Sequence, residues 1–248
     1  MIVLKSSDEV EKMAIASKIV AEVLLVLKEM LQPGVTTVDL DKVAEERIRK
    51  QGGVPAFKGY RGYPATLCAS VNEQVVHGIP SKRPLKEGDI VGLDLGAVWE
   101  GYYGDSAVTL PVGRVGDQTQ RLMEVTRTSL YEGITRIQVD GRLSDVSHAI
   151  QTCVESAGFS VVRDFVGHGI GRNLHEEPQV PNYGKPGSGP RLKVGMVLAV
   201  EPMVNAGGYG VRILEDQWTV VTEDGSLSAH FEHTVALTEL GPKILTEV

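Results

Sequence analysis

The first part of the chain repeats apolar residues every three or four positions, which is the spacing of an amphipathic helix. Ser6 precedes the first run, and Glu9 follows three residues later in the arrangement of a capping box. Pro33 ends this run. A second run begins beside Thr37 and stops at Gly52. The pattern therefore predicts two consecutive helices.

The pattern then changes to short apolar runs, returns to helical spacing and changes again to short runs. Short apolar runs bounded by turn residues are typical of strands. Helices followed by strands, twice in succession, predict an α+β fold. The predicted strands cover residues 65–71, 90–97, 102–110, 160–163, 197–204, 217–222 and 229–238, and the later helices cover 117–137 and 144–157.

The second half of the chain echoes the first. Residues 85–91 and 192–198 both read Leu-Lys-x-Gly-x-aliphatic-aliphatic, 107 positions apart. Each glycine is followed six residues later by an acid, Asp94 or Glu201, and the residues that begin two of the helices share the same offset. The repeat predicts an internal duplication with a site where the two halves meet.

Composition excludes several classes of protein. The 248 residues are 42% apolar with a net charge of −7, so the chain lacks the basic surface of a nucleic-acid binder. Cys68 and Cys153 have no zinc-site spacing. The opening MIVLKSSDEV is unlike a signal peptide, and no apolar stretch approaches the ~20 residues of a membrane span. These features predict a cytoplasmic protein without membrane attachment.

Asp94 and Asp105 interrupt apolar strands, where an ionised carboxylate is costly unless it is paired or bound to metal. If Trp99 and Glu100 form a two-residue hairpin loop, the two acids face one another with Cβ atoms ~5 Å apart. A loop shifted by one position changes the pairing but keeps both acids on one face. A three-residue loop would separate them.

Two such carboxylates must share either a proton or a cation. A shared proton would indicate a site like that of an aspartic protease or a glycosidase. A cation needs more ligands, and Glu201, Glu232 and the glycine-flanked His168 supply them. Four carboxylates and an imidazole suit two metals ~3.5–4 Å apart that activate a water for hydrolysis. Taken singly, each acid could instead be a strand-end residue or an ion-pair partner.

Five blocks of the sequence, in order, resemble the short bacterial type I methionine aminopeptidases: "GYRGYPATLCASVNEQVVHGIP", "GDSA", "VGHGIGRNLHEEPQVPNYG", "LAVEPM" and "LSAHFEHTV". The resemblance implies one metallopeptidase domain over residues 1–248 in the pita-bread fold. That fold has two pseudo-symmetric halves, about 1–111 and 112–248 here, and a curved, mostly antiparallel sheet flanked by helices. The implied activity is removal of the N-terminal methionine from nascent proteins and peptides.

The resemblance also implies two divalent metal ions, of cobalt, manganese, iron or zinc. In this family pattern Asp94 chelates one metal, Asp105 and Glu232 bridge both, and His168 and Glu201 complete the second site. Glu201 is in addition the expected proton shuttle.

By the same resemblance His77 and His175 hydrogen-bond the substrate peptide. His168 and His175 lie seven residues apart in glycine-rich sequence, and we expect irregular backbone to present one ring to metal and the other to substrate. The methionine pocket is expected to be lined by Tyr60, Tyr63, Cys68 and Trp218, with Phe57 and Leu174 where the family often has cysteine and phenylalanine.

Two other functions remain open. Gly96, in "LDLGA", stands where type I enzymes commonly carry threonine, and the run is more like prolidases and aminopeptidase P. Those proline-specific enzymes share the fold and ligands but lack the "FEHT" and "YRGYP" contexts. The other alternative is a peptide-binding module that has lost its ligands, although all five are present here. The expected partners are nascent chains near the ribosome, with no specific nucleic acid, and the expected state is a monomer.

Overall fold

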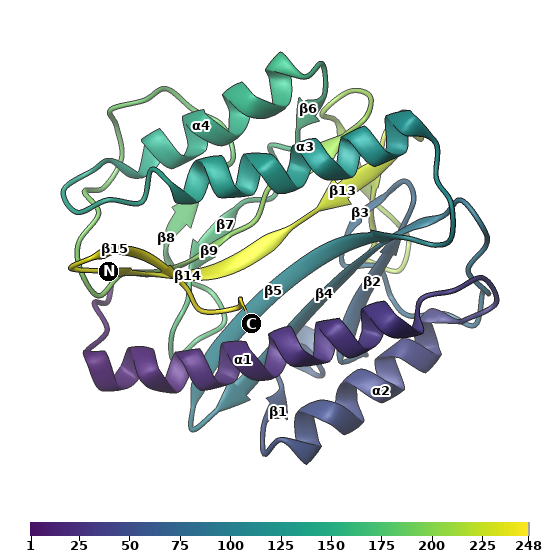
Figure 1. The fold of residues 1–248 in the computed structure, drawn as a ribbon, viewed down its shortest axis with the longest axis horizontal. Helices are drawn as coiled ribbons and strands as arrows, with labels where there is room; N and C mark the ends of the chain where they lie inside the picture. The colour runs from purple at the N-terminus through teal and green to yellow at the C-terminus, as the bar shows by residue number, and fades with distance from the viewer. Residues whose placement is uncertain (248) are drawn as a thin grey trace.

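Four α-helices pack in two pairs against a curved sheet, one pair over each half of it (Figure 1). The computed structural model describes residues 1–247. Most of the predicted helices and strands are present, which confirms the α+β class. The helices are α1 (Ser7–Met30), α2 (Thr37–Lys50), α3 (Asp117–Ile134) and α4 (Leu143–Ser156), with a short 3-10 helix η1 (Tyr60–Gly62).

The main sheet has nine strands in the order β1-β4-β5-β14-β9-β7-β8, with β2 added on β4 and β15 on β14. Two three-stranded sheets, β13-β10-β6 and β11-β12-β3, complete the structure. The strands are β1 (Val54–Pro55), β2 (Leu67–Val71), β3 (Gln74–Val76), β4 (Ile90–Trp99), β5 (Tyr102–Pro111), β6 (Ser160–Val161), β7 (Gly167–Gly169), β8 (Glu176–Val180), β9 (Val197–Val200), β10 (Met203–Asn205), β11 (Val211–Ile213), β12 (Val220–Thr222), β13 (Ser228–His230), β14 (Glu232–Thr238) and β15 (Gly241–Ile244).

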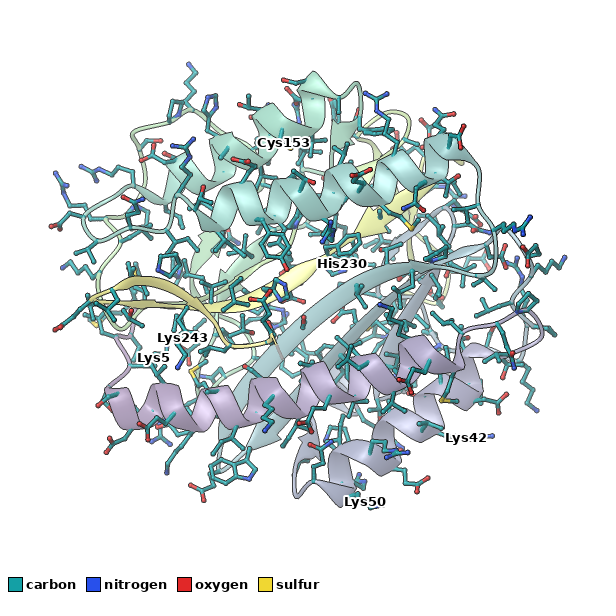
Figure 2. All side chains as sticks on the ribbon, in the orientation of Figure 1. Lys5, Lys42, Lys50, Cys153, His230 and Lys243 are labelled. Atoms are coloured by element: carbon teal, nitrogen blue, oxygen red, sulfur yellow. The ribbon has the colours of Figure 1, made fainter. Side chains whose placement is uncertain are left out.

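The N-terminal helices form where the sequence predicts them. The capping box is confirmed, because the Glu9 amide donates to Ser6 Oγ and the Ser6 amide donates to the Glu9 carboxylate. Helix α2 buries Ile48 against the sheet and exposes Lys42 and Lys50 to solvent (Figure 2). Each large aliphatic side chain buried in this way contributes about 1.5–3 kcal/mol. Helices α1 and α2 therefore form one outer layer over the first half of the sheet.

The β4–β5 hairpin differs by one position from the first expectation. Its loop is Glu100 and Gly101, which have φ angles of 48° and 80°, the left-handed geometry of a tight two-residue hairpin. Asp94 therefore pairs with Ala107, and Asp105 pairs with Gly96. The two acids do not face one another directly, but the even shift keeps both on the same face of the sheet.

Two predicted strands are each broken into two. The run over 197–204 ends at Val200, because Pro202 has no N–H with which to continue a ladder. The run over 229–238 breaks at Phe231. The two breaks lie beside Glu201 and Glu232, so both acids occupy strand ends at the middle of the molecule.

The repeated sequence segments also repeat their geometry. Gly88 and Gly195 have φ angles of 89° and 88°. In both turns the residue after the glycine donates a hydrogen bond of 3.1 Å to the carbonyl three residues earlier. Both segments then enter a central strand, β4 in one half and β9 in the other. A duplicated helix–helix–strand unit would produce this match in geometry.

Candidate metal centre

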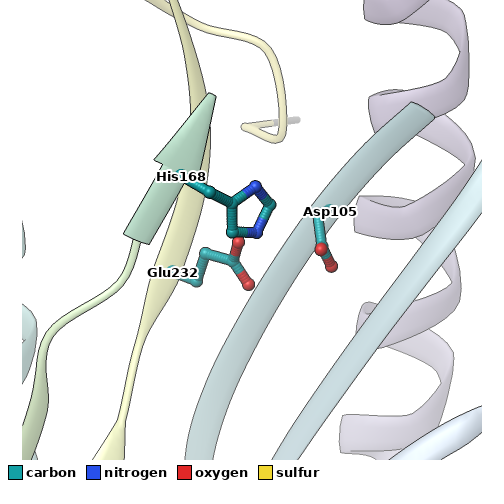
Figure 3. Close-up of side chains that lie close together, drawn as sticks. All are labelled: Asp105, His168 and Glu232. Carbon is teal, nitrogen blue, oxygen red and sulfur yellow. The ribbon is translucent and has the colours of Figure 1, made fainter. Parts of the chain in front are cut away.

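Three side chains from three different strands converge on one point (Figure 3). Asp105 projects from β5, His168 from β7 and Glu232 from β14, and one donor atom from each lies within 4.8 Å of the other two. All three residues are buried, with exposed fractions of 6% or less. The sheet thus brings together residues that lie 63, 64 and 127 positions apart in the chain.

The remaining two predicted ligands line the same cavity. Glu201 lies at the end of β9, with its Oε1 atom 3.6 Å from His168 Nε2. Asp94 reaches the cavity from β4. All five predicted ligands therefore border a single space.

Hydroxyl side chains hold these strands together at the site. Strands β5 and β14 share only two paired positions. Thr234 Oγ1 donates to the Asp105 carbonyl at 2.7 Å and accepts from the Asp105 amide at 3.1 Å. Ser106 Oγ donates to the Glu232 carbonyl at 2.7 Å. The backbone of both acids is fixed by these bonds, so their side chains start from defined positions.

The pKa values of the four carboxyl groups of the site are raised. Burial, together with the neighbouring Glu201 carboxylate, raises the pKa of Asp94 to about 7, and burial raises the pKa of Glu201 to about 8. Burial and the other acids raise the pKa values of Asp105 and Glu232 well above the ordinary range. Without a cation these four groups cannot all ionise near neutral pH.

Unpartnered atoms show what the site can accept. One carboxyl oxygen each of Asp94, Asp105 and Glu232 is buried without a hydrogen-bond partner. Such orphaned oxygens are unusual in folded proteins and indicate a missing ion or water. Four carboxylates and one imidazole match the donors that manganese, iron, cobalt and zinc accept. The residues present therefore fit a divalent metal.

The His168 ring is oriented as a ligand. Its Nδ1 atom lies 2.9 Å from the Gly169 carbonyl, so this nitrogen carries the proton and Nε2 faces the site with a lone pair. Burial, followed by the nearby His175, lowers the pKa of His168 to about 4. The ring is therefore neutral at physiological pH, which is the form that binds metal.

The glycine-rich segment is more regular than expected. His168 lies in strand β7, and a Cβ atom on Gly167 or Gly169 would collide with the backbone of β9 or β8. The glycines thus allow three strands to approach closely. His175 lies in the turn before β8, and the reversal brings the two rings to 4.2 Å between centroids. The expectation of irregular backbone holds for His175 and is wrong for His168.

The two histidines predicted to meet substrate both line the cavity. The Tyr60 hydroxyl lies 2.9 Å from His175 Nδ1, and the two rings stack. His77 has a φ of 59°, a strained value for a residue other than glycine. Its ring contacts Phe165 and Trp218 edge-on. Local strain of this kind is often retained at functional sites.

An apolar recess adjoins the acids. The whole cavity, acids and recess together, has a volume of about 160 Å³. The six predicted pocket residues all line it: Phe57, Tyr60, Tyr63, Cys68, Leu174 and Trp218.

The absence of a side chain at Gly96 leaves room for the ring of its neighbour Phe57. A Cβ atom on Gly96 would lie 2.7 Å from the Phe57 ring and 2.9 Å from Ala56 Cβ. Any larger residue at position 96 would displace the buried ring. The departures at positions 57 and 96 are therefore parts of one packing arrangement. Gly96 does not by itself indicate a proline-specific enzyme.

Sequence reasoning missed two residues of the site, one that contacts Glu201 and one that lines the cavity. His230 is buried, and its Nε2 atom lies 3.4 Å from Glu201 Oε2. Arg61 lines the mouth of the cavity and has a φ of 49°. The spacing of His230, two residues before Glu232, was the available signal. It was weak because the intervening strand break could not be located from the sequence.

A larger groove of about 760 Å³ lies between α3 and α4 and includes Cys153 and His148. Metal-binding groups within residues 1–247 cluster at the central cavity and not in this groove. Size alone therefore does not identify the functional site.

The chain is similar to known metallopeptidases over almost its whole length. The model of metallopeptidase family M24 matches residues 11–239. Methionine aminopeptidase 1 of Bacillus subtilis is 55% identical over 248 residues, covering 100% of both chains. The crystal structure of methionine aminopeptidase from Thermotoga maritima superposes with a TM-score of 0.99 at 52% identity and covers 100% of both chains.

More distant structures share the fold alone. Prolidase from Pyrococcus furiosus superposes with a TM-score of 0.81 at 21% identity, over 99% of this chain and 66% of that one. The pita-bread architecture is thus common to enzymes of different specificity, and the much closer matches above decide between them.

Proposed function

Because the chain belongs to the methionine aminopeptidases of metallopeptidase family M24, we propose that it hydrolyses the first peptide bond of peptides and nascent proteins that begin with methionine. The observation that carries this function is the convergence of four carboxylates and one imidazole beside an apolar recess. Neither feature alone would support this function. The acids alone would not select a substrate, and the recess alone would not catalyse hydrolysis.

The proposed cofactor is a pair of divalent metal ions. Asp94 would hold one ion, Asp105 and Glu232 would bridge the two, and His168 and Glu201 would complete the second position. When bound, the ions supply Lewis acidity that makes water nucleophilic near neutral pH and polarises the peptide carbonyl. The family membership and the donor cluster support metal dependence, and the choice of metal depends on availability in the cell.

Side chains of the enzyme handle protons and orientation. Glu201, whose pKa burial raises to about 8, is suited to take a proton during attack and to return it to the leaving amine. Burial, followed by the Arg61 charge, lowers the pKa of His175, which keeps this ring neutral. With Tyr60 on its Nδ1, His175 Nε2 can face the carbonyl oxygen of the substrate and stabilise its developing charge. His77 would orient the peptide from the opposite wall.

The apolar recess provides the specificity. A methionine side chain is flexible and apolar, and it makes favourable sulfur–aromatic contacts with rings such as Tyr63 and Trp218, which meet edge-on at 5.1 Å. Proline specificity, the alternative function, is not favoured by the close relatives. A peptide-binding module without activity is not favoured either, since all the candidate ligands are present.

The wider setting follows from the same proposal. The chain acts as one catalytic domain of two related halves, residues 1–111 and 112–248, with the site between them. In the part of the chain that the structure describes, no helix combines the length and apolar character needed to cross a membrane. Nascent chains near ribosomes in the cytoplasm are the proposed substrates, and the monomer is the proposed active form.

A paired peptidase assay tests this function. Metal-free protein is supplied with manganese or cobalt and offered Met-Ala-Ser and Ala-Pro-Ala. We expect methionine release from the first peptide only, and only with added metal. Cleavage of the second peptide alone would assign the chain to the proline-specific enzymes. Metal binding without cleavage of either would leave a binding module.

A further inference from the structure

His230 is the last residue of β13 and lies in the interior of the molecule, beside β5 (Figure 2). Its backbone is fixed from two sides. The His230 amide donates to Thr109 Oγ1 at 2.9 Å, and the Thr109 hydroxyl donates to the His230 carbonyl at 2.8 Å. On the other side His230 pairs with Met203 of β10. The ring therefore starts from a rigid position.

Within residues 1–247, no hydrogen bond of the His230 ring explains its burial. Its Nε2 atom is buried and unpartnered, like the orphaned oxygens of Asp94, Asp105 and Glu232. An unsatisfied buried donor of this kind destabilises a fold, so it is rarely kept without a reason. His233, three residues later, is different because its Nδ1 contacts Thr246 Oγ1 at 2.8 Å and its Nε2 contacts the Tyr131 hydroxyl at 3.1 Å. His233 is thus explained by structure, whereas His230 is not.

Within residues 1–247, the carboxylate at ion-pair distance from His230 is that of Glu201, and Asp94 lies near enough to act on the ring electrostatically. Within residues 1–247, the charged-group contacts of Glu201 are to two imidazoles. His168 Nε2 lies 3.6 Å from Oε1, and His230 Nε2 lies 3.4 Å from Oε2. Each imidazole ring therefore lies beside a different oxygen of the Glu201 carboxylate. Carboxylates that bind metal are normally held by a second hydrogen bond of this kind, which fixes their orientation.

We propose that His230 is a positioning residue of the metal centre. With Nε2 3.4 Å from Glu201 Oε2, the ring is placed to donate its N–H to this oxygen and to hold the carboxylate so that Oε1 stays directed to the metal position beside His168. The inference rests on the proposed function of Glu201 as a ligand. It assigns a role to a residue that touches neither substrate nor metal, and it predicts that the N–H donor, rather than the imidazole as such, is what the site requires.

The test compares His230→Gln, which retains an N–H donor at a similar reach, with His230→Leu, which has none. The probe is Mn²⁺ alone, titrated into metal-free protein by calorimetry, with kcat and KM for Met-Ala-Ser measured in parallel. We expect His230→Gln to bind Mn²⁺ within about threefold of the wild type, and His230→Leu to bind about 10- to 100-fold more weakly. KM at saturating metal should change little in either variant.

His233→Leu is the matched control, since it removes a neighbouring, partly buried histidine that does not line the cavity. It should lower thermal stability and leave Mn²⁺ affinity within about twofold. Unchanged Mn²⁺ affinity in His230→Leu would overturn the positioning role. Equal losses in the Gln and Leu variants would overturn it as well, because that result would make the imidazole a direct ligand. Failure of the wild type to bind Mn²⁺ would instead contradict the proposed function.

Discussion

At the scale of single residues, the centre depends on carboxylates that the protein itself leaves unsatisfied. Asp94, Asp105 and Glu232 each keep one buried oxygen without a partner, while hydroxyl groups satisfy the backbone around them. The fold thus holds the backbone firmly and leaves the side-chain oxygens available. This arrangement is costly in the metal-free protein and favourable once a cation is present.

Glu232→Gln tests this directly. The amide has nearly the same shape but lacks the charge needed to bridge two cations, so metal stoichiometry should fall and activity should drop more than about 100-fold. Metal content by elemental analysis and turnover of Met-Ala-Ser are the measurements. Glu239→Gln, at an exposed position, is the control and should change neither. A Glu232→Gln enzyme with two metals and normal turnover would contradict the bridging role.

His175→Ala should separate binding of metal from catalysis. The ring is held by Tyr60 and is not one of the five proposed metal ligands, so metal affinity should remain while kcat falls by about 10²- to 10³-fold. Tyr60→Phe should show a smaller loss of the same kind. Loss of metal in the His175 variant would show that its role has been misassigned.

The pairing of Gly96 with Phe57 predicts strong coupling. Gly96→Ala should destabilise the protein by about 1–3 kcal/mol, because the added methyl group collides with the Phe57 ring. Adding Phe57→Cys should recover about 0.5–3 kcal/mol of that loss. Chemical denaturation of the two single variants and the double variant measures the coupling.

Gly92→Ala, on the same strand, is the control because its Cβ atom would meet only ordinary contacts of 3.5 Å or more. Equal effects of the Gly92 and Gly96 variants would refute the proposed packing conflict.

At the scale of elements, a buried ion pair connects the N-terminal segment to the turn that carries His175. Lys5 Nζ lies 2.7 Å from Glu176 Oε2, and both side chains are at most 10% exposed. Burial raises the pKa of Glu176, but hydrogen bonds from Lys5 and the Asn173 amide outweigh it and leave the pKa below its ordinary value. The pair therefore stabilises the fold above the unfolded-state pKa of about 4.3, and this contribution is lost as the pH falls through the lower folded-state value.

Lys5→Met should cost about 3 kcal/mol near neutral pH, because it leaves a buried carboxylate unpaired. The difference from the wild type should shrink as the pH falls through the lowered pKa of Glu176, where this carboxylate becomes protonated. Denaturant titrations at several pH values measure both effects. Lys12→Met removes an exposed pair with Glu100 and should cost less than about 1 kcal/mol. A pH-independent difference for Lys5→Met would exclude the ion pair as its cause.

At the scale of the whole molecule, the cavity lies where the two halves of the sheet meet. Strands β4 and β5 come from the first half, and β7, β9 and β14 come from the second. A cation bound between them would therefore connect the halves as well as serve the chemistry. This position predicts a link between metal binding and global stability.

Mn²⁺ at 100 times its dissociation constant should stabilise the folded protein by about 2.7 kcal/mol, which corresponds to a rise of roughly 5–10 °C in the unfolding midpoint. Calorimetry of the metal-free protein with and without Mn²⁺ gives the shift. The Glu232→Gln variant should show a much smaller one. An unchanged midpoint in the wild type at saturating Mn²⁺ would mean that metal binds the folded and unfolded chains equally.

The sequence by itself determined which residues are the candidates for the chemistry. Acids within apolar strands are recognisable because burying a charge without a partner is so costly that such residues rarely occur without a reason. The capping box of α1 and the breaks at Pro33 and Gly52 are equally local, and the structure agrees with them. Local signals are readable because their physics involves only a few neighbouring residues.

Only the tertiary structure decided how those residues meet. The one-position shift of the β4–β5 loop, the strand breaks beside Glu201 and Glu232 and the approach of His230 to Glu201 all depend on pairing between distant segments. The conflict between a Cβ atom at position 96 and the Phe57 ring is also a contact across the sheet. Such contacts are set by packing of the whole chain, in which each position is fixed by neighbours that the local sequence does not name.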